Sequence, residues 1–249
     1  MPELLYPPVI AAAKTMFRVL DLRLTVEGVH HVPRTGGAVM ASNHVSYLDF
    51  IFCGYGAHES GRLVRFMAKH DVFAHKVSGP LMRGMKHIPV NRAAGAGSYN
   101  TAVEALRRGE VVGVFPEATI SRSFRVKELK NGAARMSQEA GVPLLPVALW
   151  GTQRLWTKGR PRTLTRRHTP ITILIGEPMD PAAYPDVNTM TAELKSRLSA
   201  LVDRAQQEYP DAPAGADDSW WQPLHLGGSA PTLDEAAELD RRGRRASTA

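Results

Sequence analysis

The stretch that decides the fold is AVMASNHVSYLDF, residues 38–50. Its first four residues are apolar and typical of a buried strand, and they lead to His44, with a carboxylate, Asp49, five residues later. Residues five apart on one helix point about 140° apart, so this pair can meet only across a turn. Ser46 predicts that turn, because a serine followed three residues later by an acid is typical of a helix N-cap. We therefore expect a helix through residues 48–52, with Asp49 accepting the Nδ1 proton of His44 and Nε2 left to act as a base.

The same stretch also has a purely structural explanation. A Ser-x-x-Asp turn caps a helix without any catalytic purpose, and a histidine near the end of a strand is usually a satisfied polar residue. Taken alone, residues 38–50 leave the catalytic and the structural interpretation open, and the rest of the chain has to decide.

Length and charge limit what the chain can be. Its 249 residues are enough for one sizeable α/β domain. The 31 lysines and arginines outnumber the 24 aspartates and glutamates by seven, which favours a negatively charged partner such as a phosphate, a coenzyme, an anionic lipid or a nucleic acid. The single cysteine, Cys53, excludes an intrachain disulfide and a cysteine-built metal site, and its apolar surroundings predict a small core residue.

The first 21 residues are largely apolar, with interspersed basic side chains. No uninterrupted apolar run approaches the ~20 residues needed to span a bilayer, and the N-terminus lacks the basic start and cleavage site of a signal peptide. We therefore expect no membrane span. Residues 1–21 fit an amphipathic helix that lies on a membrane surface, and equally a terminal helix packed on its own domain.

The segments that follow alternate between strand and helix patterns. Strand-like runs occupy residues 23–26, 38–41, 63–68, 87–90, 111–115, 144–149 and 171–175, and helix-like runs occupy 98–108, 127–140 and 188–208. This alternation predicts one α/β domain at residues 22–210, with a mixed, mostly parallel sheet covered by helices. Pro146 favours an edge or end position for its strand.

Residues 211–249 differ in composition from the rest of the chain. They are rich in Ala, Gly, Pro and charged residues, with one apolar island around Trp220 and Trp221. We expect an extended tail that these tryptophans pin to the domain, with a short helix near residues 232–241.

A second motif, FPEATIS at residues 115–121, follows the buried strand predicted at residues 111–115. Ligand chemistry in α/β proteins usually lies at the carboxyl ends of strands, which places Glu117 at the rim of the sheet. His44 also leaves the carboxyl end of a strand. The two groups are therefore expected at the same edge.

Together, the two motifs resemble the signatures of the glycerolipid acyltransferases typified by lysophosphatidic acid acyltransferase. That family has a His-x4-Asp block and a Phe-Pro-Glu-Gly-Thr-Arg-Ser block, which correspond here to His44 with Asp49 and to residues 115–121. Three further segments resemble family motifs in the family's order: Met67-Ala68-Lys69, Ile88-Pro89-Val90-Asn91-Arg92 and Val142-Pro143-Leu144-Leu145-Pro146-Val147. The resemblance covers about residues 25–180.

The resemblance implies a glycerol-phosphate acyltransferase-like fold and an acyl transfer reaction. The donor is acyl-CoA or acyl carrier protein, and the acceptor is a hydroxyl of lysophosphatidic acid or a related lysophospholipid, which gives phosphatidic acid. His44 is then the general base, Asp49 orients it and Glu117 positions the acceptor. Because Ser46 is better used as a cap than as a nucleophile, direct attack by the acceptor oxygen is favoured over an acyl-enzyme. Backbone N–H groups after Ser46 or in the turn at residues 113–118 are candidates for stabilising the oxyanion, and the chemistry requires no metal or further cofactor.

Basic and hydroxyl side chains are the candidates for binding the acceptor. Lys69, Arg92 and Thr119 stand in segments that resemble family motifs, and Arg122 and Lys130 are further candidates near them. The chain departs from the family pattern at two positions, since Ala118 replaces a glycine and Ile120 replaces an arginine that helps to bind phosphate in relatives. Arg122 is the nearest replacement for this arginine.

The other expected partner is an anionic membrane surface. The basic loop at residues 154–168 is placed to rest on anionic headgroups or to hold coenzyme phosphates, and the expected location is the cytoplasmic face of the cell membrane, with peripheral or monotopic attachment. The loop lacks a recognisable nucleic-acid-binding fold, so we expect no nucleic acid partner. Two alternatives are a hydrolase that uses the same His–Asp pair with water, and a non-catalytic lipid-binding protein, although the complete His44, Asp49 and Glu117 set argues against the latter.

Overall fold

The computed structural model describes residues 4–90 and 97–246, with side chains to residue 243. In this part of the chain seven strands form one sheet: β1 (Arg23–Glu27), β2 (Ala38–Ser42), β3 (Val64–Lys69), β4 (Ile88–Val90), β5 (Val111–Val114), β6 (Leu144–Trp150) and β7 (Pro170–Ile175). The helices described are α1 (Tyr6–Val19), α2 (Asp49–His58), α3 (His70–Ala74), α4 (Ser78–Gly84), α5 (Gly97–Arg107), α6 (Gly132–Ala140), α7 (Val187–Gln207) and α8 (Leu233–Ala246).

The strand order is β1-β7-β6-β2-β5-β3-β4, and neighbouring strands are parallel except for β6 and β7. The predicted mixed, mostly parallel sheet is therefore confirmed. All five residues of β2 are buried, as expected for a central strand covered on both faces. Because β2 and β5 are adjacent and parallel, their carboxyl ends meet at one edge, where His44 and Glu117 follow them.

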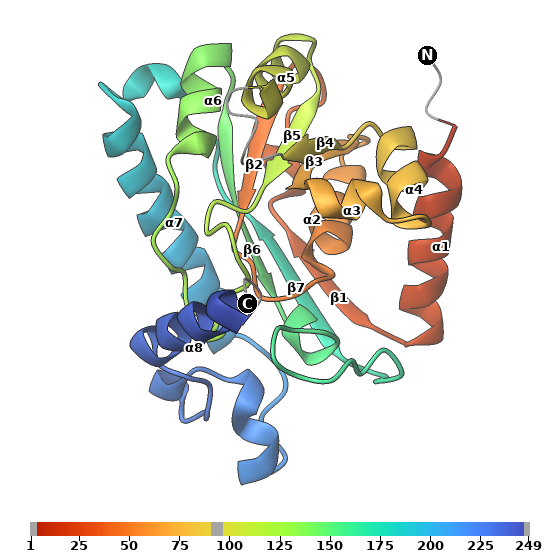
Figure 1. Ribbon diagram of the computed structural model, residues 1–249, viewed down its shortest axis with the longest axis vertical. Helices are drawn as coiled ribbons and strands as arrows, with labels where there is room; N and C mark the ends of the chain where they lie inside the picture. The colour runs from red at the N-terminus through yellow and green to blue at the C-terminus, as the bar shows by residue number, and fades with distance from the viewer. Residues whose placement is uncertain (1–3, 91–96, 247–249) are drawn as a thin grey trace.

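Helices cover both faces of the sheet (Figure 1). On one face, Phe17 of α1 and Phe52 of α2 pack with sheet residues such as Leu145. On the other face, α5, α6 and α7 bury an apolar cluster against β2 and β5. Cys53 is part of the first cluster, as predicted for a small core residue, and burial raises the pKa of its thiol.

Two predictions about individual elements are wrong. α6 begins at Gly132 instead of near residue 127, because the chain after β5 continues as an irregular loop. Of the two positions expected for Pro146, the edge strand is wrong, since β6 lies between β7 and β2. Pro146 is tolerated there because it precedes Val147, the first residue of β6 that pairs with β7, and its missing N–H therefore falls outside that ladder.

α1 packs on its own domain. Phe17 is buried and stacks on Phe52 with 5.0 Å between ring centroids, and the Tyr6 hydroxyl donates to the carbonyl of Val64. This is one of the two arrangements expected for residues 1–21, and contact of this region with a membrane stays a prediction. Within residues 4–90 and 97–246, no helix combines the length and apolarity required to cross a bilayer.

The C-terminal residues fold back onto the domain. Trp221 ends a 3-10 helix (Ala216–Trp221) and is buried in an apolar cluster with Phe124 and Trp150, so a tryptophan pins the tail as expected. α8 then continues beyond the short helix expected at residues 232–241, and it lies at the lower left of the molecule in Figure 1. The domain boundaries at residues 21 and 210 stay a prediction.

Candidate active site

His44 and Asp49 meet in the turn between β2 and α2, as the sequence predicts. Nδ1 of His44 lies 2.9 Å from Oδ2 of Asp49, which also accepts the backbone N–H groups of Val45 at 2.7 Å and Ser46 at 2.8 Å. The other carboxylate oxygen, Oδ1, accepts the hydroxyl of Thr152 at 2.6 Å. Asp49 is fully buried. Four donors therefore hold this carboxylate in place. Of these four, only the imidazole of His44 is titratable.

The predicted N-cap position of Ser46 is wrong, although the side-chain hydrogen bonds of a Ser-x-x-Asp turn are present. α2 begins at Asp49 with Leu48 at the N-cap position, and the hydroxyl of Ser46 accepts the N–H of Leu48 at 3.1 Å while it donates to the carbonyl of Trp156 at 2.7 Å. The carboxylate of Asp49 accepts the N–H groups of Val45 and Ser46, which precede the helix, and these two bonds stabilise the turn. The N–H groups after Ser46 also have acceptors within the protein, since that of Tyr47 donates to the carbonyl of Trp156 and that of Leu48 donates to the Ser46 hydroxyl. The expected part of these groups, and of the turn at residues 113–118, in stabilising an oxyanion stays a prediction.

The imidazole of His44 faces an aromatic wall. It stacks on Phe115, with ring centroids 4.2 Å apart and planes 20° apart, and Phe115 in turn stacks on Phe66. The side chain of His44 remains 20% exposed although Asp49 beneath it is at 0%. With Nδ1 held by the carboxylate, Nε2 is the nitrogen left for a substrate, which is the arrangement of an oriented general base.

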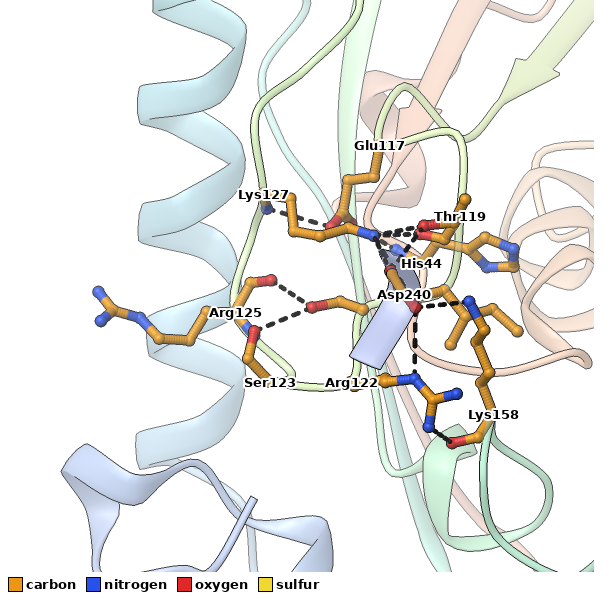
Figure 2. Close-up of polar contacts among 11 residues, drawn as sticks. His44, Glu117, Thr119, Arg122, Ser123, Arg125, Lys127, Lys158 and Asp240 are labelled. Atoms are coloured by element: carbon orange, nitrogen blue, oxygen red, sulfur yellow. Dashed lines mark hydrogen bonds and ion pairs between the residues drawn. The ribbon is translucent and has the colours of Figure 1, made fainter. Parts of the chain in front are cut away.

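Glu117 reaches the same edge of the sheet, where its carboxylate is bound by the protein itself. Oε1 accepts the backbone N–H of His44 at 2.8 Å, and Oε2 accepts the backbone N–H of Lys127 at 3.1 Å (Figure 2). Burial raises the pKa of Glu117 to about 7, although the two N–H groups and the charge of Lys127 act in the opposite direction. Glu117 therefore holds the backbone that carries His44, a positioning role that the sequence does not reveal.

The raised pKa of Glu117 predicts a pH dependence of stability. The folded pKa of about 7 lies above the ordinary value of 4.5, so the unfolded chain loses this proton first. The contribution of protonated Glu117 to the free energy of unfolding is then complete below about pH 4.5. It is lost as pH rises through 7, and the loss is on the order of 3 kcal/mol. In urea unfolding at pH 5, 6, 7 and 8, wild type should lose stability relative to Glu117→Gln by about this amount. A difference between the two proteins that does not change with pH would contradict the shift.

Arg122 and Thr119 belong to a cluster of polar and charged side chains around Asp240. Arg122, Lys127 and Lys158 surround the carboxylate of Asp240, which comes from α8, and Thr119 lies between Lys127 and that carboxylate (Figure 2). Ile120, at the position of the family's arginine, is buried. Ala118 has a φ of 62°, a left-handed conformation in which the family's glycine has no steric cost.

The side-chain contacts described for Lys69 and Lys130 do not include Asp240. Lys69 ends β3 with an exposed side chain that pairs with Asp71. Lys130 is exposed and lines a polar groove of about 760 Å³ with α7, and its backbone N–H donates to the carbonyl of Pro116. Arg92 lies outside the described residues.

The basic loop at residues 154–168 is covered in part by the C-terminal tail. Three of its cations pair with tail acids, with N–O distances of 2.6 Å for Arg154–Asp211, 2.6 Å for Lys158–Asp240 and 3.4 Å for Arg166–Asp218. The expected contact of this loop with headgroups or coenzyme phosphates stays a prediction for the exposed members Arg160, Arg162 and Arg167.

Comparison with known proteins finds acyltransferases that are similar to this chain. The family model described as Acyltransferase matches residues 23–150. A 1-acyl-sn-glycerol-3-phosphate acyltransferase of Bacillus subtilis is 29% identical over 199 residues, which cover 78% of this chain and 90% of the relative. A protein of the same name from Neisseria gonorrhoeae is 33% identical over 144 residues, 57% of this chain and 54% of the relative.

A solved structure shares the fold. The crystal structure of the 1-acyl-sn-glycerophosphate acyltransferase PlsC from Thermotoga maritima matches 82% of this chain and 81% of its own, with a TM-score of 0.70 and 23% sequence identity. The family model covers just over half of the chain and includes His44, Asp49 and Glu117. The chain therefore belongs to the acyltransferase family.

Proposed function

We propose that the chain transfers a fatty acyl group from a thioester, acyl-CoA or acyl carrier protein, to the free hydroxyl of lysophosphatidic acid, giving phosphatidic acid. The observation that carries this proposal is the pairing of His44 with the fully buried Asp49, which leaves one imidazole nitrogen for a substrate. The names of the relatives from Bacillus subtilis and Neisseria gonorrhoeae support the choice of acceptor.

The reaction follows from this pair. Nε2 of His44 takes the proton of the acceptor hydroxyl while its oxygen attacks the thioester carbonyl carbon. Asp49 stabilises the imidazolium that results. The tetrahedral intermediate then collapses, the C–S bond breaks, and the departing sulfur takes the proton back from His44, so that an ester and a free thiol are formed. No metal and no cofactor other than the thioester enters these steps.

The acceptor reaches the site from a membrane surface in this proposal. In Figure 1 the N-terminal region and the α3–α4 segment lie on the same side of the molecule. These segments carry exposed apolar side chains: Leu4, Val19, Val72, Val77 and Leu81. Basic side chains accompany them, including Arg18 and Lys76. Apolar insertion together with attraction to anionic headgroups supports peripheral attachment, with the cytoplasmic face as the proposed side and no role for nucleic acid.

Thiol release tests the function. The purified protein is mixed with acyl-CoA or acyl carrier protein in vesicles that contain lysophosphatidic acid, monoacylglycerol or no acceptor, and free thiol is followed together with the lipid product. Thiol release that requires lysophosphatidic acid and yields phosphatidic acid is expected. Release that is independent of any acceptor would identify a thioester hydrolase, and no turnover with any acceptor would contradict the proposal.

Arg122→Ala is expected to weaken the use of phosphate-bearing acceptors selectively. A hydrogen bond to a charged group contributes about 1.5–3 kcal/mol, so kcat/KM for lysophosphatidic acid should fall on the order of 10- to 100-fold while that for monoacylglycerol changes little. Arg125→Ala is the matched control, because Arg125 is exposed in the same loop and Figure 2 shows its guanidinium directed away from the cluster. An unchanged ratio between the two acceptors would remove Arg122 from the phosphate site.

A further inference from the structure

A carboxylate from the C-terminal helix occupies the centre of a cation cluster, Arg122, Lys127 and Lys158. Oδ1 of Asp240 lies 2.6 Å from Nζ of Lys158 and 3.3 Å from Nε of Arg122, while Oδ2 lies 3.9 Å from Nζ of Lys127. The hydroxyl of Thr119 donates to Oδ2 at 3.5 Å. The side chain of Asp240 is only 10% exposed, so this charge is largely withdrawn from water.

The cation cluster carries more positive charge than Asp240 neutralises. Three cations face Asp240, and Lys127 also acts on the carboxylate of Glu117, whereas a phosphate monoester brings about two negative charges and three acceptor oxygens. A phosphate group therefore matches the cluster better than the resident carboxylate does. Asp240 thus places one negative charge in a site that can accommodate an anion with about two.

A chain of hydrogen bonds links the cation cluster to the backbone of His44. The side chain of Lys127 donates to the carbonyl and hydroxyl oxygens of Thr119 at 2.8 and 2.6 Å, and its backbone N–H donates to Glu117. Glu117 in turn holds the backbone N–H of His44. Figure 2 shows these residues as one group around Asp240. An anion held by the cluster therefore lies beside the segment that carries the general base.

The buried contacts of α8 centre on Asp240, and Leu233 and Leu239 are partly covered, each 39% exposed. Of its side chains at residues 233–243, only Ala236 and Asp240 are buried, four residues apart on one face of the helix. The methyl group of an alanine contributes only about 0.8 kcal/mol on burial. Glu238 pairs with Arg241 and Arg242 within the helix itself. Removing the ion pairs of Asp240 would therefore leave little to keep α8 in place.

The segment before α8 is anchored separately. The backbone N–H groups of Ser229 and Ala230 donate to the carbonyls of Ser219 and Gln222, close to the buried Trp221. Thr232 and Glu235 then form a capping box, in which the Thr232 hydroxyl accepts the N–H of Glu235 at 3.2 Å and the Glu235 carboxylate accepts the N–H of Thr232 at 2.8 Å. α8 can consequently leave the domain as a capped helix while the tail remains attached.

We propose that Asp240 is a built-in competitor for a phosphate monoester, so that α8 covers the cation cluster until the phosphate of the acceptor displaces it. This inference rests on the proposed function for the identity of the acceptor, and on the cation cluster alone for the binding of phosphate. It assigns the C-terminal tail a role in the affinity of the enzyme for its acceptor.

Asp240→Asn tests the proposal, with Asp234→Asn as the matched control because Asp234 is an exposed acid of the same helix. Without the competing charge, KM for lysophosphatidic acid should fall about three- to tenfold while KM for the thioester is unchanged. The control should behave as wild type. Ala236→Glu, which forces α8 off the domain while retaining Asp240, should lower the acceptor KM in the same way.

Two measurements without turnover separate this inference from the proposed function. Inorganic phosphate should raise the Tm of Asp240→Asn more than that of wild type, and lysophosphatidic acid or inorganic phosphate should increase amide hydrogen exchange in α8 of wild type. If lysophosphatidic acid is not a substrate, these two measurements still decide the inference. The proposal is overturned if acylation occurs but phosphate gives no larger Tm shift in Asp240→Asn and no ligand changes hydrogen exchange in α8, while folded Asp240→Asn and Ala236→Glu show an unchanged or raised acceptor KM. In that case Asp240 only holds the cations in place.

Discussion

Replacing His44 by alanine lowers kcat for acyl transfer by about 10²- to 10⁴-fold in our expectation, the range found for loss of a general base. The change removes the titratable side chain that donates to Asp49 and the ring that stacks on Phe115. The loss should appear in kcat more than in either KM, because proton transfer takes place in the transition state. Thiol release under saturating donor and acceptor measures it.

Three controls accompany His44→Ala. Circular dichroism and thermal unfolding establish that the variant is folded, and His70→Ala, an exposed histidine at the start of α3, should retain full activity. Added imidazole should restore part of the rate if the side chain carries a proton, whereas it would not restore a purely structural role. Near-normal turnover by a folded His44→Ala protein would end the catalytic assignment.

Local features of the site could be predicted from the sequence because they depend on neighbours in the chain. His44 and Asp49 are five residues apart, and a strand end followed by a helix start leaves few ways to arrange them. The shared edge for Glu117 followed from a further rule, that parallel strands present their carboxyl ends together. The error at Ser46 arose within the same local pattern, because both the serine and the acid can bind the N–H groups of the turn and the carboxylate binds two of them.

Contacts that join distant segments could not be predicted in this way. Thr152 lies 103 residues from the carboxylate to which it donates, and Asp240 lies 118 residues from Arg122. Nothing in the residues around Thr152 or Asp240 marks them, since a buried threonine and an acid in a charged helix are both common. Lys127 and Lys158 were likewise indistinguishable from solvated basic residues until packing brought them to one carboxylate. Tertiary packing decides these partners, whereas sequence spacing decides the His44–Asp49 pair.

Asp49→Asn should lower kcat by about 10²- to 10³-fold and the free energy of unfolding by only about 1–3 kcal/mol. An asparagine has the same shape but only one acceptor oxygen, so its orientation decides the outcome. The N–H groups of Val45 and Ser46 both point at the Oδ2 position, and an amide NH₂ placed there would oppose two fixed donors. The amide oxygen of the substituted side chain should therefore stay on that side and continue to accept from Nδ1 of His44.

The amide nitrogen of the variant would then face Thr152, whose hydroxyl can rotate from donor to acceptor. This arrangement keeps His44 in its tautomer and removes only the negative charge that stabilises the imidazolium, so the loss of rate measures that charge. Two measurements test it: the ¹⁵N shifts of His44 should still report a protonated Nδ1, and the rate should fall as stated. Asp49→Ala is the contrasting variant, because it leaves the N–H groups of Val45 and Ser46 buried without an acceptor, which costs about 1–3 kcal/mol for each group. It should lose clearly more stability than Asp49→Asn. If Asp49→Asn instead moved the proton to Nε2, the two backbone donors would not control the orientation of the side chain; if it kept full activity, the buried charge would have no part in catalysis.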